Sequence, residues 1–459
     1  MLSKIEQYLF YIFVFSIPFQ TRKILWYSGW RFEEWSSVSV YLTDVLFFVL
    51  LLFWVVNFLK QGRKFSIFNF QFSIKLQFLS SKLKNPNLYL FLFIIISAIS
   101  IKNFDNYSIS WFQWGKLVEF IVFYYYLSRY AFSKFGLNGF FLAIITSGVF
   151  QSIIAYFQYA KRSNIGFKYL GESFLSADLP GVASFIMPDG EKIIRAYGTT
   201  PHPNVLAIFL LTGLFGFYLS YLYIHIHREK KPLADGMDWF LVSSYVVMLF
   251  GFLFTFSRTI IFAWLMSFLA RSVMSLRKNY INIWRIFSRD RLFVVIVSSM
   301  AVMIIFSFLY QDKIISRLLI NSEDQAVQLR GFYNSEVIHG NISYFGIGTG
   351  NFINWMVKNN PYLPYYAYQP VHNIYLLIYS ENGILGISAF LLFLFFSGKR
   401  FLLSDAFKRF DGLAVFVFIG TLLFIGFFDH MFWTLQQGRF VFWSALALGT
   451  FVLDKNTQN

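Results

Sequence analysis

The sequence predicts an all-α polytopic membrane protein with about twelve transmembrane helices, and three observations support this fold class. Hydrophobic residues make up 57% of the 459 residues and charged residues only 14%, whereas charged residues are about a quarter of a soluble domain. Apolar runs of roughly 15–25 residues recur along the chain. Lys and Arg concentrate in alternate connections between these runs, as the positive-inside rule requires. Residues 1–459 are therefore interpreted as a single integral membrane domain.

Composition also excludes several kinds of chemistry. The chain has no cysteine, so disulfides, thiolate catalysis and Cys-ligated metals are ruled out. The net charge of +16 is explained by basic cytoplasmic loops and does not require a nucleic-acid partner. The first apolar run has one basic residue before it and no small-residue cleavage site, so it is interpreted as a retained span.

The expected spans follow from the apolar runs, and their orientation follows from the basic residues between them. The third span is short and could be tilted or re-entrant. The positive-inside bias puts both termini in the cytoplasm, and the two long connections, 161–202 and 311–371, outside. The expected spans lie near residues 5–20, 40–59, 88–101, 111–128, 137–160, 203–225, 238–255, 258–276, 291–310, 372–397, 413–429 and 432–453.

The second long connection, between the ninth and tenth spans, has internal structure of its own. Residues 322–325 form a capping box, and apolar residues then recur at helical spacing up to Gly340. This pattern predicts a short amphipathic helix, with Arg330 beside its apolar face. The glycines of residues 346–350 indicate a tight turn, because no βαβ pattern surrounds them. The apolar positions of the helix are Ala326, Leu329, Tyr333 and Val337.

A cation or a titratable group stands at each of three helix N-termini that face outside in this topology. Arg195 precedes the sixth span, Arg258 begins the eighth and His372 begins the tenth. A helix N-terminus carries partial positive charge, so arginine there is misplaced unless an anion joins it. Together these groups indicate a phosphate site. The alternatives are that each arginine snorkels to lipid headgroups and that His372 is an interfacial polar residue.

Motifs at these positions resemble those of the O-antigen ligase and polymerase family. Arg195-x-x-Gly198 with Pro203-Asn204 resembles its first motif, and Ser257-Arg258 its second. The long outer loop, His372-Asn373 and the segment Glu381–Gly386 resemble the third. The resemblance implies a GT-C-type fold and transfer of glycans from undecaprenyl pyrophosphate. It implies that Arg195, Arg258 and Arg330 bind the pyrophosphate and that His372 is the catalytic base. Supporting roles are assigned to Asn204, Asn373, Glu381, His430 and Arg439.

The sequence therefore predicts an inverting glycosyltransferase of the bacterial cytoplasmic membrane, active on the outer face. Metal sites often use two histidines at helix spacing beside carboxylates, and the predicted outer side has no such pattern. Glycan transfer is therefore expected to need neither a metal nor a cofactor. The partners are a lipid-linked glycan donor, a glycan, lipid or protein acceptor, and the bilayer. Ligation and polymerisation of repeat units both remain open. The rivals are a glycolipid transporter, which should place polar groups at the bilayer midplane, and a non-catalytic scaffold.

Overall fold

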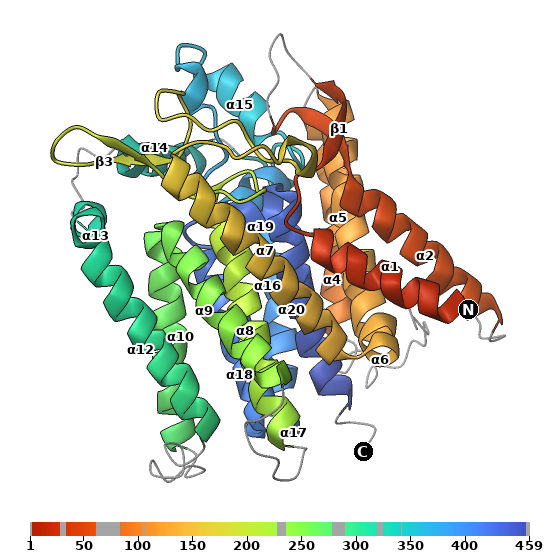
Figure 1. Cartoon of the computed structure of the whole chain (residues 1–459). Helices are drawn as coiled ribbons and strands as arrows, with labels where there is room; N and C mark the ends of the chain where they lie inside the picture. The colour runs from red at the N-terminus through yellow and green to blue at the C-terminus, as the bar shows by residue number, and fades with distance from the viewer. Residues whose placement is uncertain are drawn as a thin grey trace.

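The computed structural model describes residues 2–27, 34–60, 83–103, 106–226, 236–277, 290–318, 325–340 and 342–455. The chain is mostly helical, with two short antiparallel hairpins, β1–β2 and β3–β4 (Figure 1). The elements are α1 (Leu2–Ser16), β1 (Arg22–Tyr27), β2 (Ser37–Tyr41), α2 (Leu42–Lys60), α4 (Pro86–Ser100), α5 (Tyr107–Tyr126), α6 (Phe132–Phe135), α7 (Leu137–Lys161), β3 (Ser184–Ile186), β4 (Lys192–Ile194), α8 (Pro203–Ile226), α9 (Gly236–Phe254), α10 (Arg258–Arg277), α12 (Asp290–Leu309), α13 (Gln311–Leu318), α14 (Gln325–His339), α15 (Phe352–Asn359), α16 (Ile374–Leu402), α17 (Asp405–Lys408), α18 (Phe410–Ile425), α19 (Met431–Thr434) and α20 (Gln436–Lys455).

Each of the twelve predicted spans coincides with a helix, within a few residues at most ends. By length and apolarity, six of the described helices are able to cross a membrane, namely α2, α4, α7, α8, α9 and α16. The bent pair of α12 and α13 raises this number to seven, and α10 and α18 contain shorter apolar stretches. A polytopic membrane protein is therefore confirmed, whereas a count of twelve spans stays a prediction.

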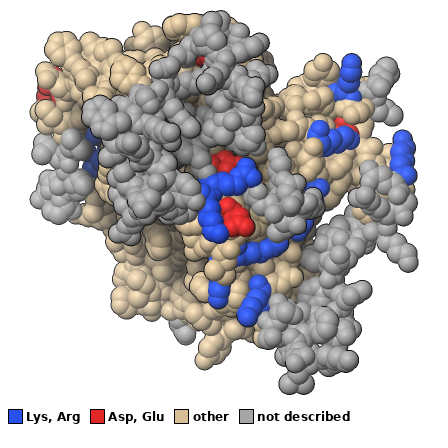
Figure 2. Space-filling view, turned by 90° about the horizontal axis from the view of Figure 1, so that it is seen from below, with Lys and Arg blue, Asp and Glu red and all other residues tan. Residues whose placement is uncertain are grey.

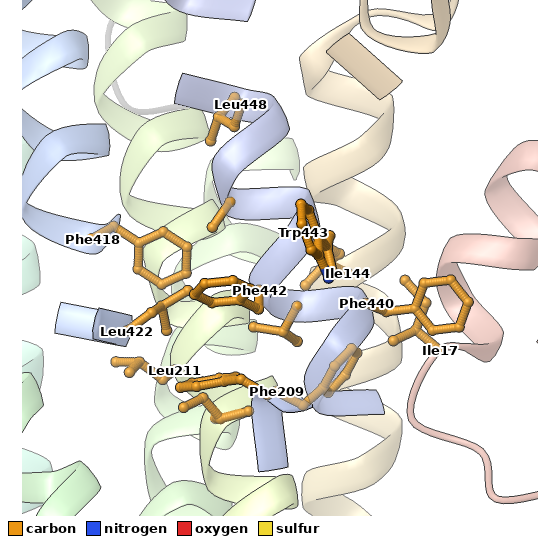
Figure 3. Close-up of a cluster of buried hydrophobic side chains, with 14 of the residues drawn as sticks. Ile17, Ile144, Phe209, Leu211, Phe418, Leu422, Phe440, Phe442, Trp443 and Leu448 are labelled. Carbon is orange, nitrogen blue, oxygen red and sulfur yellow. The ribbon is translucent and has the colours of Figure 1, made fainter. Parts of the chain in front are cut away.

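The last helix, α20, lies in the middle of the bundle and organises its core. Figure 3 shows Phe440, Phe442 and Trp443 of α20 among side chains of α7, α8 and α18. Phe209 of α8 and Phe418 of α18 are almost completely buried in the same cluster. Large aromatic side chains bury more apolar area than any others, so this cluster fixes the helices whose ends carry the polar groups described below.

The connections predicted to lie outside gather at one end of the bundle. Figure 1 shows β1, β3, α14 and α15 at the upper end. Lysine and arginine side chains spread over the opposite face, seen in Figure 2. Ion pairs near the helix ends there join Arg129 and Arg400 to Asp454, and Lys134 to Glu6. This basic face is the one that the positive-inside prediction assigns to the cytoplasm.

A helix, α14, lies in the second long connection where the apolar spacing places one. Its Tyr333 and Val337 are fully buried against Phe352 and Met356 of α15. The predicted capping residues 322–324 lie outside the described residues. Packing of α14 on α15 and on the start of α16 holds this connection over the end of the bundle.

A break in α16 receives the glycine-rich turn of residues 346–350. Gly383 has φ +68°, a conformation that L side chains rarely adopt. The N–H groups of Ile347 and Gly348 donate to the carbonyls of Ser380 and Glu381 at 2.9 and 3.0 Å. A Cβ on Gly383 would lie 2.0 Å from the Tyr344 carbonyl oxygen, so only glycine permits this approach. The turn and the broken helix form one rigid unit.

Candidate active site

Two histidine rings meet at the end of the bundle where the hairpins gather. The ring centroids of His372, before α16, and His430, after α18, are 5.0 Å apart. Tyr333 of α14 lies nearly parallel to the His372 ring at 6.1 Å. Trp35 meets the His430 ring edge-on at 5.1 Å. Four segments that are far apart in the sequence therefore build one aromatic group around His372.

Local hydrogen bonds fix the backbone beside His372. The Asn373 side chain accepts from the N–H groups of Tyr375 and Leu376 at 2.9 and 3.1 Å, which caps α16. The N–H of Ile374 donates to the carbonyl of Gly426 at 2.8 Å. Asn373, a predicted supporting residue, thus caps the helix that follows His372. The ring of His372 is held where the helix begins.

The environment of His372 favours the neutral imidazole. Surrounding protein, reinforced by His430 and the positive charge of Arg330, lowers the pKa of His372 to about 3, although Asp429 opposes this shift. Its Nδ1 atom is buried and has no hydrogen-bond partner among the described residues. A neutral imidazole has a lone pair on one ring nitrogen. The ring is therefore free to accept a proton from a bound molecule.

Arg195 is buried in a network that joins three separate turns. Its Nε donates to the carbonyl of Thr255 at 2.7 Å, and a terminal nitrogen donates to Asn204 Oδ1 at 2.7 Å. Asn204 Oδ1 also accepts from the Ser257 hydroxyl at 2.9 Å, and Asn204 Nδ2 donates to Asp429 at 2.7 Å. Because the acceptors of Arg195 are neutral oxygens, these bonds orient its charge without cancelling it.

Two further arginines stand beside Arg195. Arg258 donates to the carbonyl of Arg317 at 3.1 Å, and Arg317 donates to the carbonyl of Phe256 at 3.4 Å. Burial, with the positive charges of Arg317 and Arg258, lowers the pKa of Arg195 to about 9. The guanidinium of Arg195 therefore remains protonated at neutral pH, and the three like charges repel one another.

Arg330 of α14 completes a group of four, called here the arginine cluster (Arg195, Arg258, Arg317 and Arg330). Its Nε atom is buried without a hydrogen-bond partner among the described residues. The positive charge of Arg330 contributes to lowering the pKa of both His372 and His202. For His202, burial and the charge of Arg195 are the larger causes, and its pKa is lowered to about 3. Concentrated positive charge with an open donor is suited to a multiply charged anion.

Helix N-termini add to the positive potential at this end. Of the helices at the site, α8 starts at Pro203, α10 at Arg258 and α16 at Ile374. The turn before α10 is strained, because Phe256 has φ +45°. The Ser257 carbonyl accepts from the N–H of Ile261 in the first turn of α10 at 2.9 Å. The strained turn thus presents Arg258 and the helix start to the site.

Comparison with known families identifies the central part of the chain. Residues 243–391 match the family model described as O-antigen ligase. This segment is therefore similar to O-antigen ligases. No curated protein matches the chain. The matched segment contains Arg258, Arg317, Arg330 and His372. Arg195 lies before that segment, and the hairpin with His430 lies after it.

Most of the residues predicted from the sequence fall into two groups in the structure. Arg195, Asn204, Arg258, Arg330, His372 and His430 form the group just described. Glu381 and Arg439 lie beside a separate cavity of about 610 Å³. There Trp433 Nε1 donates to Glu381 at 2.7 Å, and Arg439 donates to the Trp433 carbonyl and to Gln113 at 2.6 and 2.7 Å. The predicted roles of all these residues stay predictions.

Three site residues were not selected from the sequence. Arg317 lies in the last turn of α13, in a connection predicted to be outside. Basic residues are disfavoured in outside connections, so its position alone could have marked it as a candidate. His202 accepts the N–H of Asn204 at 3.1 Å through Nδ1. Asp429 also accepts the N–H of Met431 at 3.1 Å. No group of three or more His, Asp or Glu side chains in the described ranges is arranged to hold a metal ion.

Proposed function

We propose that this protein transfers a glycan from undecaprenyl pyrophosphate to an acceptor hydroxyl at the outer face of the bacterial cytoplasmic membrane. The observation that carries the proposal is the neutral, open His372 ring beside the arginine cluster. A glycosyl pyrophosphate already has a good leaving group, so the enzyme must hold the departing charge and deprotonate the acceptor. The arginine cluster suits the first task, and His372 suits the second.

The chemical step is a single displacement. The acceptor hydroxyl gives its proton to the His372 ring as its oxygen bonds to the anomeric carbon of the donor. The bond from that carbon to the phosphate oxygen breaks, and its electron pair leaves with the pyrophosphate. Bound pyrophosphate brings negative charge close to His372 and raises its pKa above the value in the enzyme without donor. Inversion at the anomeric carbon follows, and neither a metal nor a cofactor takes part.

The proposed topology has twelve spans in a GT-C-like arrangement, with both termini in the cytoplasm. Residues 1–459 form one membrane domain, and the connections 161–202 and 311–371 lie outside. The basic face opposite the site (Figure 2) supports this orientation. Polar groups of the site gather at one end of the bundle, whereas a transporter should place them at the midplane.

Reconstitution with a defined donor tests the proposal. The protein is placed in nanodiscs, undecaprenyl-pyrophosphate oligosaccharide is added with a panel of acceptors, and products are resolved by mass spectrometry. A ladder of repeat units from donor alone identifies a polymerase, and a single transfer that needs an acceptor identifies a ligase. Arg258→Ala should abolish either product. Donor that stays intact with every acceptor would contradict the proposal and make lipid transport the next assay.

A further inference from the structure

The cavity that contains Glu381 is separate from the arginine cluster and has no role in the step above. It is lined by side chains of α5, α16, α20 and the chain before β2, and by the turn of residues 349–353. The space enclosed by these residues, including the part open to solvent, is about 610 Å³. The polar and aromatic side chains that matter for its chemistry are Glu34, Trp35, Gln113, Glu381, Trp433 and Arg439.

The polar groups of the Glu381 cavity are held in fixed directions. The Glu381 carboxylate accepts from Trp433 Nε1 at 2.7 Å and from the N–H groups of Gly350 and Phe352. Arg439 donates to the Gln113 amide oxygen at 2.7 Å, which leaves the amide nitrogen of Gln113 as a donor. Fixed carboxylate, amide and guanidinium groups beside indole rings match the hydroxyls and the apolar faces of a sugar ring. A polyprenyl chain could not accept from the amide nitrogen of Gln113, whereas a sugar hydroxyl could.

Charges around the Glu381 cavity are matched by the protein itself. Arg439 experiences the carboxylates of Glu381, Glu119 and Asp44. Lys116 pairs with Asp44 at 2.5 Å and with Glu119 at 3.0 Å. Since each cation already faces carboxylates, an added anion would not find uncompensated positive charge. The cavity therefore suits a neutral ligand, unlike the arginine cluster.

The Glu381 cavity reaches the catalytic histidine through His430. Thr434 lines the cavity and its hydroxyl lies 2.6 Å from His430 Nδ1. Trp35 also lines the cavity, and its ring meets that of His430 at 5.1 Å. None of the four arginines of the arginine cluster lines it. In a displacement with inversion, the attacking oxygen and the leaving pyrophosphate lie on opposite sides of the anomeric carbon, so two separate subsites beside His372 are required.

We propose that the Glu381 cavity binds the acceptor sugar, an uncharged pyranose whose free hydroxyl is directed toward His372. The proposal rests on the proposed function, because it assigns the second substrate of the same reaction. Gln113 and Glu381 bond to ring hydroxyls, and Trp35 and Trp433 cover the apolar face of the ring. A sugar bearing a carboxylate or phosphate is excluded by the balanced charges of the walls.

Two substitutions on α5 separate the acceptor subsite from the donor subsite. Gln113→Leu removes the amide, and Leu117→Phe fills the cavity from a buried lining position. With full-length protein in nanodiscs, each should raise the KM for the acceptor about tenfold or more, as expected for an unmet buried hydrogen bond or lost space. The KM for undecaprenyl-pyrophosphate glycan should change less than about twofold. Trp111→Ala, on the same helix but exposed and outside the cavity, is the matched control and should change neither value.

The outcomes distinguish the two proposals. If wild-type protein transfers no glycan, the proposed function fails. If wild-type protein is active but Gln113→Leu and Leu117→Phe raise the KM of the donor instead, the cavity holds donor glycan and the acceptor assignment is overturned. Unchanged KM values for both substrates in folded variants would make the cavity structural, which also overturns it.

Discussion

The arginine cluster and the Glu381 cavity both lie near one histidine pair and handle charge in opposite ways. Arg195 is oriented by neutral oxygens of Thr255 and Asn204, and the one nearby carboxylate that acts on it, Asp429, is opposed by the positive charges of Arg317 and Arg258. Arg439 is also oriented by neutral oxygens, but Glu381 and other carboxylates stand close to it. The comparison shows that the hydrogen-bond partners of an arginine do not by themselves indicate whether its site suits a charged or a neutral ligand. The local balance of charge does, since a buried ion needs a counter-charge from protein or ligand.

The largest effect on the rate of glycan transfer is expected from substitution of His372, which is assigned to neither the arginine cluster nor the Glu381 cavity. His372→Ala should lower kcat by about 100- to 10,000-fold, because the acceptor loses its base. The KM values of donor and acceptor should change little, since neither the arginine cluster nor the Glu381 cavity is altered. Initial rates in nanodiscs measure this. His339→Ala is the matched control, because His339 is an exposed histidine of α14. Glycan transfer unchanged in His372→Ala would remove the base assignment.

The next effect separates the arginine cluster from the Glu381 cavity. Arg195→Lys keeps the charge but loses the planar donors that reach Thr255 and Asn204. We expect the KM for the lipid-linked donor to rise about 10- to 100-fold, corresponding to about 1–3 kcal/mol for buried groups left without partners. Arg439→Lys should leave the donor KM unchanged. If the two substitutions raised the KM for the donor equally, the arginine cluster and the Glu381 cavity would not be separate donor and acceptor sites.

The pH dependence of activity tests whether charge bound at the arginine cluster changes the pKa of His372. This group must be neutral to accept a proton, so activity falls as the pH drops through its pKa. In the free enzyme that pKa is lowered to about 3, so kcat/KM should stay level from pH 8 to about 5. Donor pyrophosphate in the arginine cluster raises the pKa, so the acid limb of kcat should lie about one unit or more higher. Coincident limbs for kcat and kcat/KM would contradict this electrostatic link.

Periodicity and charge position made the helices and part of the site predictable from the sequence. Apolar runs locate twelve helices, because a chain in lipid must satisfy its own backbone hydrogen bonds. Arg195, Arg258 and His372 were found because a cation at an outer helix N-terminus conflicts with both the dipole and the positive-inside rule. Both signals are local in the sequence and need no knowledge of packing.

Pairings across the fold were not predictable in this way. The β1–β2 hairpin, which brings Trp35 to His430, has no strong turn signal. Arg317 gains its place only because α12 and α13 meet at an angle of 89°. Glu381 was grouped with the catalytic residues through the motif resemblance of residues 381–386, and Arg439 because it is near His430 at the outer end of the last predicted hairpin. Whether a polar residue faces one cavity or another depends on helix rotation and on the break at Gly383, which a motif does not specify.

The smallest effect is expected at the contact that holds α14 over the site. The Tyr333 hydroxyl donates to the carbonyl of Ala367 at 2.6 Å, and its ring lies against His372. Tyr333→Phe keeps the ring and removes one hydrogen bond, which contributes about 0.5–1.5 kcal/mol. Because Arg330 is on the same helix, loosening α14 should raise the donor KM about two- to fivefold, within the range of that energy. The acceptor KM should stay constant, since α14 does not line the Glu381 cavity. If Tyr333→Phe changed the KM for the acceptor more than the KM for the donor, the assignment of α14 to the donor subsite would be wrong.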